Sequence, residues 1–344
     1  MDFRLKTCNL LLQFTKHING YLLPAPDVYL RRINRSLYGM PRMTNGNRAY
    51  DGNNLVMTAE EKDELIHHDP IVAKWIHPYY MGADLVNNKP RYVLWLNGVE
   101  IDEFSDVPSV MNRVEAVRVM RESSKNQSTR KAAKVPHLFQ TITQPNQRYL
   151  AFPRVSSSRR DYLPIAFLDP TVICGDKLII VPEGDIYVFS ILSSKAHKLW
   201  TWVFAGRLKS DISYSSSVYN NYPWPEPTHE QKVAIERSGQ AIINARNNHP
   251  GESLASLYDP DRMPADLLDA HKALDAAVEA AYGLDSKGDD NIVVAHLFKL
   301  YEKTIQKERR RNPLKKEQEA LKHDNQPLKA TVKIKVKVKS DEAN

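Results

Sequence analysis

The 344-residue sequence is poor in the residues that mark secreted and membrane proteins. It contains only two cysteines, Cys8 and Cys174, which allow one possible pair and are too few for a cysteine-only zinc site. No run of about 18 apolar residues is present, which excludes a membrane-spanning helix. The polar N-terminal segment lacks the small-residue cleavage site of a secretory signal. These absences predict a cytoplasmic protein.

Several motifs of catalytic domains are also absent. None of the 13 glycines falls in a Gly-rich turn after a strand, which an S-adenosylmethionine or nucleotide site needs so that the backbone can approach the ligand. No Pro-Pro dipeptide occurs, so the Asn/Asp-Pro-Pro-aromatic loop of amino-DNA methyltransferases is missing. Neither a phosphate loop nor an H-E-x-x-H zinc helix is present. We therefore predict no catalytic residue, no metal and no cofactor in this chain.

One nuclease-like constellation remains as an alternative, built from Asp51, Glu60 and Lys62. Metal-dependent nucleases need clustered carboxylates for Mg²⁺ and a lysine near the attacking water. However, Thr58 and Glu61 have the spacing of a capping box, which places Glu60 and Lys62 in the first turn of a helix. Acidic residues suit that position without any catalytic role, so the capped helix is the favoured interpretation.

Charge is unevenly distributed along the chain, whose net charge is only +7. Residues 111–160 contain 11 basic and two acidic residues, whereas residues 226–306 contain 14 acidic and eight basic ones. A dense basic stretch inside a foldable region is an electrostatic footprint for a polyanion, although a solvated surface is the alternative. Residues 307–344, with 12 basic and six acidic residues, are predicted to be a disordered arm.

Hydrophobic periodicity predicts an α+β protein. Period-two patterns and short apolar runs in residues 148–192 predict a mixed, curved sheet with flanking helices, and residues 89–98 predict a further strand. Residues 207–227 are predicted to be irregular. Three amphipathic segments after residue 226 predict a small all-α domain. Helices are expected from Thr58 to Pro70 and over residues 108–124, 197–206, 228–246, 263–283 and 291–305.

Several motifs, taken in order, resemble a known family. The N-terminal ones are Pro24-Ala-Pro-Asp-Val-Tyr29, Gly39-Met-Pro-Arg-Met43 and Asp51-Gly52. The most specific are Tyr219-Asn-Asn-Tyr-Pro-Trp-Pro225 and the series from Tyr258-Asp-Pro through His271 and Leu274-Asp275 to Tyr282-Gly283. Over about residues 20–306 the chain resembles MmeI-like restriction–modification enzymes. These are single-chain adenine-N6 DNA methyltransferases fused to an endonuclease.

The resemblance implies a domain organisation. Residues 1–20 would be a remnant of the methyltransferase end or an unrelated lead-in. Residues 21–225 would form a DNA target recognition domain that begins with a Pro/Gly-rich junction at 21–54. Residues 226–306 would form the helical C-terminal domain, followed by the basic tail at 307–344.

The implied function is sequence-specific recognition of double-stranded DNA for an adenine-N6 methyltransferase or restriction–modification system. S-adenosylmethionine, and Mg²⁺ for cleavage, would belong to catalytic domains in a separate or missing part. Whether this chain alone is an enzyme stays open. A non-functional remnant of a methyltransferase is a further alternative.

The resemblance also places the DNA-reading residues in the segment 207–213, with Lys209, Asp211 and Ser213 at base edges. On an extended strand, Lys209 and Asp211 would point the same way. A lysine suits guanine and an aspartate suits the cytosine amino group, so the pair could read one G·C base pair, worth about 1–3 kcal/mol. The alternative is that Lys209 and Asp211 form an exposed ion pair that contributes little to stability. Backbone contacts are expected from Arg113, Arg118, Lys125, Arg130, Lys131, Arg154, Arg159, Arg160 and Arg207.

Overall fold

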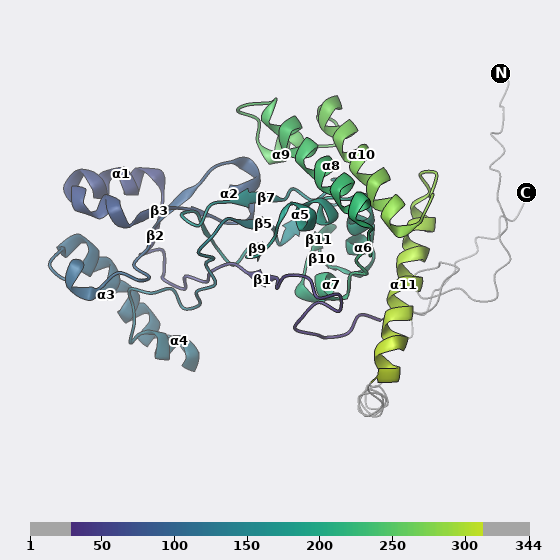
Figure 1. Cartoon of the computed structure of the whole chain (residues 1–344). Coiled ribbons are helices and arrows are strands. Elements are labelled where there is room, and N and C mark those ends of the chain that lie inside the picture. Colours follow the sequence, from purple (N-terminus) through teal and green to yellow (C-terminus); the bar gives the residue numbers. More distant parts are fainter. Residues whose placement is uncertain (1–28, 312–344) are drawn as a thin grey trace, which may run out of the picture. The chain divides into compact units, whose positions relative to one another are not determined.

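A computed structural model describes residues 29–311 (Figure 1). The lead-in at 1–20 and most of the predicted tail lie outside these residues. The described chain is a mixed α+β structure with three small sheets and a set of C-terminal helices, which confirms the expected fold class. It divides into two compact units, one ending at Lys299 and one beginning at Leu300. None of its described helices is both long and apolar enough to cross a membrane.

The first sheet has the strand order β2-β4-β3-β8, with β3 and β8 parallel and the other pairs antiparallel. Val93 and Leu94 of this sheet are buried together with Val110 and Val117 of the helix α3, as the helical spacing of the valines predicts. The elements of this region are β2 (Val56–Met57), α1 (Ala59–His68), the 3₁₀ helix η1 (Pro70–Trp75), β3 (Ile76–Tyr80), α2 (Gly82–Asn87), β4 (Arg91–Leu94), the 3₁₀ helix η2 (Ile101–Glu103), α3 (Pro108–Glu122), α4 (Gln127–Ala132) and β8 (Ile173–Cys174).

The second sheet has the order β1-β9-β5-β7 and is antiparallel. Its strands are β1 (Thr44–Asn45), β5 (Tyr149–Pro153), β7 (Ala166–Leu168) and β9 (Leu178–Val181). All residues of β5 and β9 are buried. Because both faces of these strands are buried, their sequences are continuous apolar runs and do not alternate between apolar and polar residues.

One part of the predicted sheet is wrong. Residues Ile186–Leu192 form the helix α5, not a strand. The side chain of Asp185 accepts a hydrogen bond from the Val188 amide at 2.8 Å and so caps the helix. Every residue from Tyr187 to Leu192 is buried, and a short run that is apolar on all sides does not distinguish a buried helix from a strand.

The third sheet joins β6 (Val155–Ser156), β10 (Gly206–Leu208) and β11 (Asp211–Ser213) in the antiparallel order β10-β11-β6. The hairpin that β10 and β11 form lies between α6 (Lys195–Phe204) and α7 (Ser216–Asn221) in the chain. The prediction that residues 207–227 are irregular is therefore wrong for the hairpin and for α7. Each of these elements is too short to give a clear periodic pattern.

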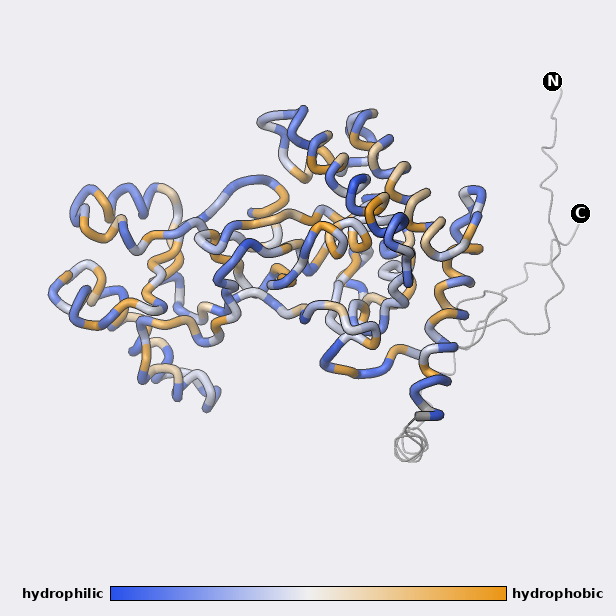
Figure 2. Tube along the Cα trace, in the orientation of Figure 1, coloured by the Kyte–Doolittle hydropathy of each residue, from blue (hydrophilic) through white to orange (hydrophobic). Residues whose placement is uncertain are grey.

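The C-terminal helices are α8 (His229–Asn247), α9 (Leu254–Leu257), α10 (Ala265–Tyr282) and α11 (Asp290–Arg311). Ile235 and Ile242 of α8 and Leu267 and Leu274 of α10 are fully buried, and the two helices pack together. Hydrophobic and hydrophilic residues alternate along both of them (Figure 2). Since α11 continues to Arg311, residues 307–311 are helical and do not belong to a disordered arm.

The junction after residue 29 is an extended segment held by α7. The Asn220 side chain donates to the Ile33 carbonyl and that of Asn221 to the Arg31 carbonyl, both at 2.8 Å. Both asparagines are buried. The Tyr-Asn-Asn motif therefore docks the junction against the rest of the domain.

Candidate nucleic-acid interface

The β10–β11 hairpin has one covered face and one open face. Ile212 pairs with Ser156 of β6, and both are buried. Since side chains alternate across a strand, Asp211 and Ser213 point to the opposite face. Leu208 pairs with Asp211 on that open face and is 59% exposed. Residues 206–210 are all exposed, so the end of the hairpin is accessible to a partner.

The geometry predicted for Lys209 is wrong. Lys209 lies in the two-residue turn between the strands, with a φ of +56°, and not on a strand beside Asp211. The direction of the Lys209 side chain is therefore set by the turn and does not follow from the alternation of side chains along a strand. Among the described residues no ion pair joins Lys209 to Asp211. The two residues belong to the same end of the hairpin, where Lys209 is exposed and Asp211 is half-buried.

Asp211 is tied to the loop that follows β6. Its Oδ1 accepts a hydrogen bond from the Ser158 amide at 3.2 Å. Arg160 in the same loop is half-buried and donates to Ser156 Oγ at 3.5 Å. Burial lowers the pKa of Arg160, and the nearby Asp211 opposes that shift. Residues 154–160, which comprise β6 and the loop that follows it, thus form one continuous polar surface with the hairpin.

Two other arginines of this surface already have partners. Arg159 forms an exposed ion pair with Asp261 at 2.5 Å. Arg207 donates to the carbonyl of Trp202 at 2.5 Å and lies 4.6 Å from the centre of the Trp202 ring. Arg154 is exposed and has no carboxylate within ion-pair distance among residues 29–311. Of the arginines predicted here, Arg154 has the least compensated charge.

The three arginines of α3 differ in their surroundings. Arg118 bridges Glu115 and Glu122 on the exposed side of the helix, and the hydrogen bonds that it donates to both carboxylates raise its pKa. Arg113 donates to the Asn54 carbonyl at 2.8 Å. These contacts make α3 a weaker source of phosphate contacts than its sequence predicts.

Arg121 is fully buried, although it lies in the basic stretch. Arg121 lies four residues after Val117 and therefore on the apolar face of α3. This spacing was the one sign in the sequence that Arg121 is buried. Its guanidinium donates to five carbonyl oxygens from two segments. These belong to Ala49, Tyr50, Ala132, Val135 and Leu138, at 2.8–3.4 Å.

Around α4, the cations of the basic stretch are accessible to solvent. Lys125, Arg130, Lys131 and Lys134 are all exposed, and in the described structure none of them forms an ion pair. Arg130 donates to the carbonyls of Ser124 and Lys125 at 2.8 and 2.9 Å. Uncompensated cations on an exposed surface attract the phosphates of a nucleic acid.

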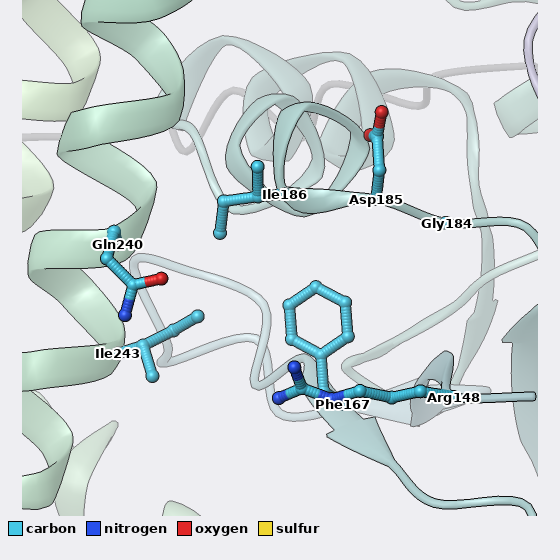
Figure 3. Close-up of a pocket in the computed structure, with 7 residues that line it drawn as sticks. All are labelled: Arg148, Phe167, Gly184, Asp185, Ile186, Gln240 and Ile243. Atoms are coloured by element: carbon cyan, nitrogen blue, oxygen red, sulfur yellow. The ribbon is translucent and has the colours of Figure 1, made fainter.

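A cavity of about 330 Å³ lies between β7, the start of α5 and α8 (Figure 3). Phe167 and Gln240 lie on its opposite sides. Arg148, another cation of the basic stretch, lines it and lies 4.3 Å from the centre of the Phe167 ring. Arg148 therefore faces this cavity.

The nuclease constellation does not assemble. Asp51 is buried, and its Oδ2 accepts hydrogen bonds from the Leu55 and Val56 amides at 2.8 and 2.9 Å. Glu60 lies in the first turn of α1, whose capping box between Thr58 and Glu61 is confirmed. Within residues 29–311, no group of three or more His, Cys, Asp or Glu side chains could hold a metal ion.

Two glycines at connections from a strand to a helix are closely packed. Gly82 is the first residue of α2, and Gly184 lies between β9 and α5. A Cβ atom at Gly82 would lie 3.3 Å from the Lys177 carbonyl oxygen, and one at Gly184 would lie 2.5 Å from Leu150 Cδ1. Protein atoms pack against both glycines, so their lack of a side chain serves packing and not the approach of a cofactor.

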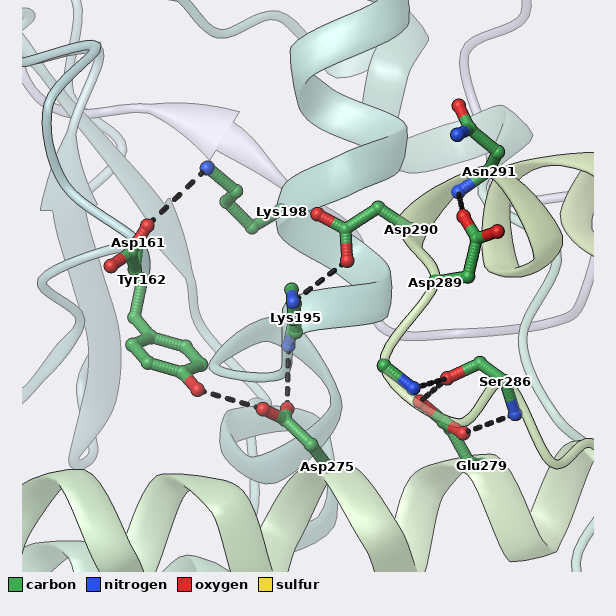
Figure 4. Close-up of polar contacts among 11 residues, drawn as sticks. Asp161, Tyr162, Lys195, Lys198, Asp275, Glu279, Ser286, Asp289, Asp290 and Asn291 are labelled. Atoms are coloured by element: carbon green, nitrogen blue, oxygen red, sulfur yellow. Dashed lines mark hydrogen bonds and ion pairs between the residues drawn. The ribbon is translucent and has the colours of Figure 1, made fainter. Parts of the chain in front are cut away.

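A partly buried polar network joins the sheet region to the C-terminal helices (Figure 4). Asp275 of α10 accepts hydrogen bonds from the Tyr162 hydroxyl and the Lys195 amide, both at 2.7 Å. Burial raises the pKa of Asp275 to about 6. The Lys195 side chain also pairs with Asp290 at 2.7 Å. Sequence reasoning missed this network, because its members are far apart in the chain.

The comparisons with known proteins cover nearly all the described residues. Residues 24–226 match the family model of the MmeI target recognition domain, and residues 227–307 match that of the MmeI C-terminal domain. DNA methyltransferase A of Bacillus subtilis (strain 168) is 29% identical over 296 residues, which are 86% of this chain and 34% of that protein.

A solved structure of the Type IIL restriction-modification enzyme MmeI in complex with DNA is 38% identical, with a TM-score of 0.82 over 85% of this chain and 39% of that one. The chain thus spans little more than a third of the length of these relatives. It belongs to the MmeI family, and residues 24–307 match that family's target recognition and C-terminal domains.

Proposed function

We propose that this chain recognises a specific sequence in double-stranded DNA as the target recognition part of an adenine-N6 DNA methyltransferase or restriction–modification system. The exposed β10–β11 hairpin carries the proposal, because it offers a donor and an acceptor in one accessible end of the recognition domain. A two-stranded ribbon fits into the major groove, where each base pair has a distinct pattern of donors and acceptors.

Base reading is assigned to Lys209, Asp211 and Ser213. The Lys209 ammonium suits the acceptors of guanine, and the Asp211 carboxylate suits the amino group of cytosine. The Ser158 amide holds one oxygen of Asp211 and leaves the other oxygen for a base. Ser213 lies on the same face of β11 and can contact an adjacent position.

Affinity is assigned to the cations that have no acidic partner among residues 29–311, above all those around α4 and Arg154. Such contacts hold the protein in register on the duplex but carry no sequence information. Each neutralised phosphate releases counterions, so binding weakens steeply as salt rises. Arg118 and Arg159 contribute less in this proposal, because each already pairs with a carboxylate. Arg113 and Arg160 also contribute less, because both are half-buried.

The chemistry is assigned to a catalytic part outside the described residues. DNA methyltransferase A is a relative of this chain, which supports the use of S-adenosylmethionine by the whole enzyme. In this proposal the catalytic part binds the cofactor and modifies the DNA, and the recognition part positions the duplex. Mg²⁺ would be needed there only if the whole enzyme also cleaves DNA.

The test is selection of the purified chain against a random duplex library, followed by binding to the enriched sequence and to a scrambled duplex at equal salt. The proposal expects one short motif, bound about 10³-fold or more tightly than the scrambled duplex. Salt-sensitive binding without an enriched motif would contradict sequence recognition by this chain.

A further inference from the structure

Tyr50 has an unusual backbone conformation for a bulky residue. Its φ is +42°, in the left-handed region that side chains other than those of Asn and Asp rarely adopt. The neighbouring Gly52 and Asn53 also have positive φ values, but those residue types tolerate the region. Tyr50 is nevertheless 40% exposed. The fold therefore maintains an unfavourable backbone in order to place a partly exposed aromatic ring.

Two buried side chains hold Tyr50 in this conformation. Arg121 donates to the carbonyl of Tyr50 at 3.0 Å and to that of Ala49 at 2.9 Å. On the other side, Asp51 accepts hydrogen bonds from the Leu55 and Val56 amides. A residue with a strained backbone is retained only where several contacts around it enforce that conformation. Such residues are more frequent at functional sites than elsewhere.

The surroundings of Tyr50 are cationic. The guanidinium of Arg48 lies 5.4 Å from the centre of its ring. The guanidinium of Arg121 that binds the Tyr50 carbonyl also binds the carbonyl of Ala132, in the segment that carries Lys131 and Lys134. Both lysines are exposed and form no ion pair with a described residue. An exposed aromatic ring can pack against a base or sugar, and nearby cations attract the phosphates of the same nucleic acid.

We propose that Tyr50 is a direct DNA contact, whose ring packs against a sugar or base of the duplex that the α4 cations hold. Arg121 acts as the positioning residue. This inference rests on the proposed function and extends it. The ring supplies a part of the affinity that does not depend on salt, whereas the lysines supply the salt-dependent part.

The test compares Tyr50→Asn with the wild-type chain in duplex-binding titrations at several salt concentrations. Asparagine tolerates a positive φ, so the substitution removes the ring without opposing the local backbone. We expect about tenfold weaker binding, an unchanged slope of log K against log salt, and a melting temperature no lower than that of the wild type. Lys131→Ala should instead reduce the slope by about one.

Two further variants make the result decisive. Tyr50→Phe keeps the ring and should bind nearly as the wild type does. Ile101→Asn removes another exposed apolar side chain and should leave binding unchanged. If Tyr50→Asn is folded and binds as tightly as the wild type, Tyr50 is not a contact and the proposed function survives. If the wild type binds no duplex at any salt concentration, both proposals fail.

Discussion

At the scale of single residues, sequence position alone does not show what a charged side chain does. Arg121 and Lys131 lie ten residues apart in the same basic stretch, yet Arg121 is buried and Lys131 is exposed. The cations of the candidate site could be predicted, because a cluster of one sign is visible in the sequence. Their partners could not, because Asp261 and the carbonyls around Arg121 are brought close only by the fold.

His197 gives a pH-dependent prediction at this scale. Its Nδ1 lies 2.9 Å from the Leu192 carbonyl and its Nε2 lies 2.8 Å from the Tyr214 hydroxyl, so the carbonyl and the hydroxyl fix a neutral ring. Burial lowers its pKa to about 4, from an ordinary value near 6.5. The unfolded chain therefore binds the proton first as pH falls, and up to about 3 kcal/mol of stability should be lost between pH 6.5 and 4.

The measurement is the free energy of unfolding as a function of pH for the wild type and for His197→Gln. The variant has no titrating group at this position, so its loss of stability over the same pH range should be smaller. Parallel curves would show that His197 does not titrate on unfolding in this range.

At the scale of elements, local signals succeeded and short apolar segments failed. The helix α1 was predictable because Thr58 and Glu61 cap it through contacts only three residues apart. The helix α5 and the β10–β11 hairpin were not, since a buried run is ambiguous and a three-residue strand is too short to show alternation. The proposed base reading depends on this hairpin, so the geometry of Lys209 had to come from the structure.

The difference between α3 and α4 gives the prediction at this scale. Arg118→Ala removes a cation that Glu115 and Glu122 already compensate, so the salt dependence of duplex binding should change little. Lys131→Ala and Lys134→Ala remove uncompensated cations, and each should reduce the slope of log K against log salt by about one. Equal effects of all three variants would show that the ion pairs on α3 open when DNA binds.

At the scale of the whole molecule, the recognition region and the C-terminal helices are joined within the first unit by the network around Asp275. Replacing Asp275 with alanine leaves the Lys195 amide and the Tyr162 hydroxyl without their acceptor. We expect this to lower the free energy of unfolding by about 2–4 kcal/mol in denaturant titrations.

A matched control lies on the same helix. Asp269 is exposed, and its one ion pair within residues 29–311 is with Lys272 of α10, so Asp269→Ala should change the unfolding free energy by less than about 0.5 kcal/mol. A similar small effect for Asp275→Ala would mean that the network does not join the two regions energetically.

The central claim is that the hairpin end reads a base pair, and exchanging its donor and acceptor tests this most directly. The wild type and the double variant Lys209→Glu, Asp211→Arg should be selected in parallel against the same random duplex library. The account predicts two motifs that differ at one base pair, with the orientation of a G·C pair reversed. Identical motifs at every position would contradict base reading by Lys209 and Asp211.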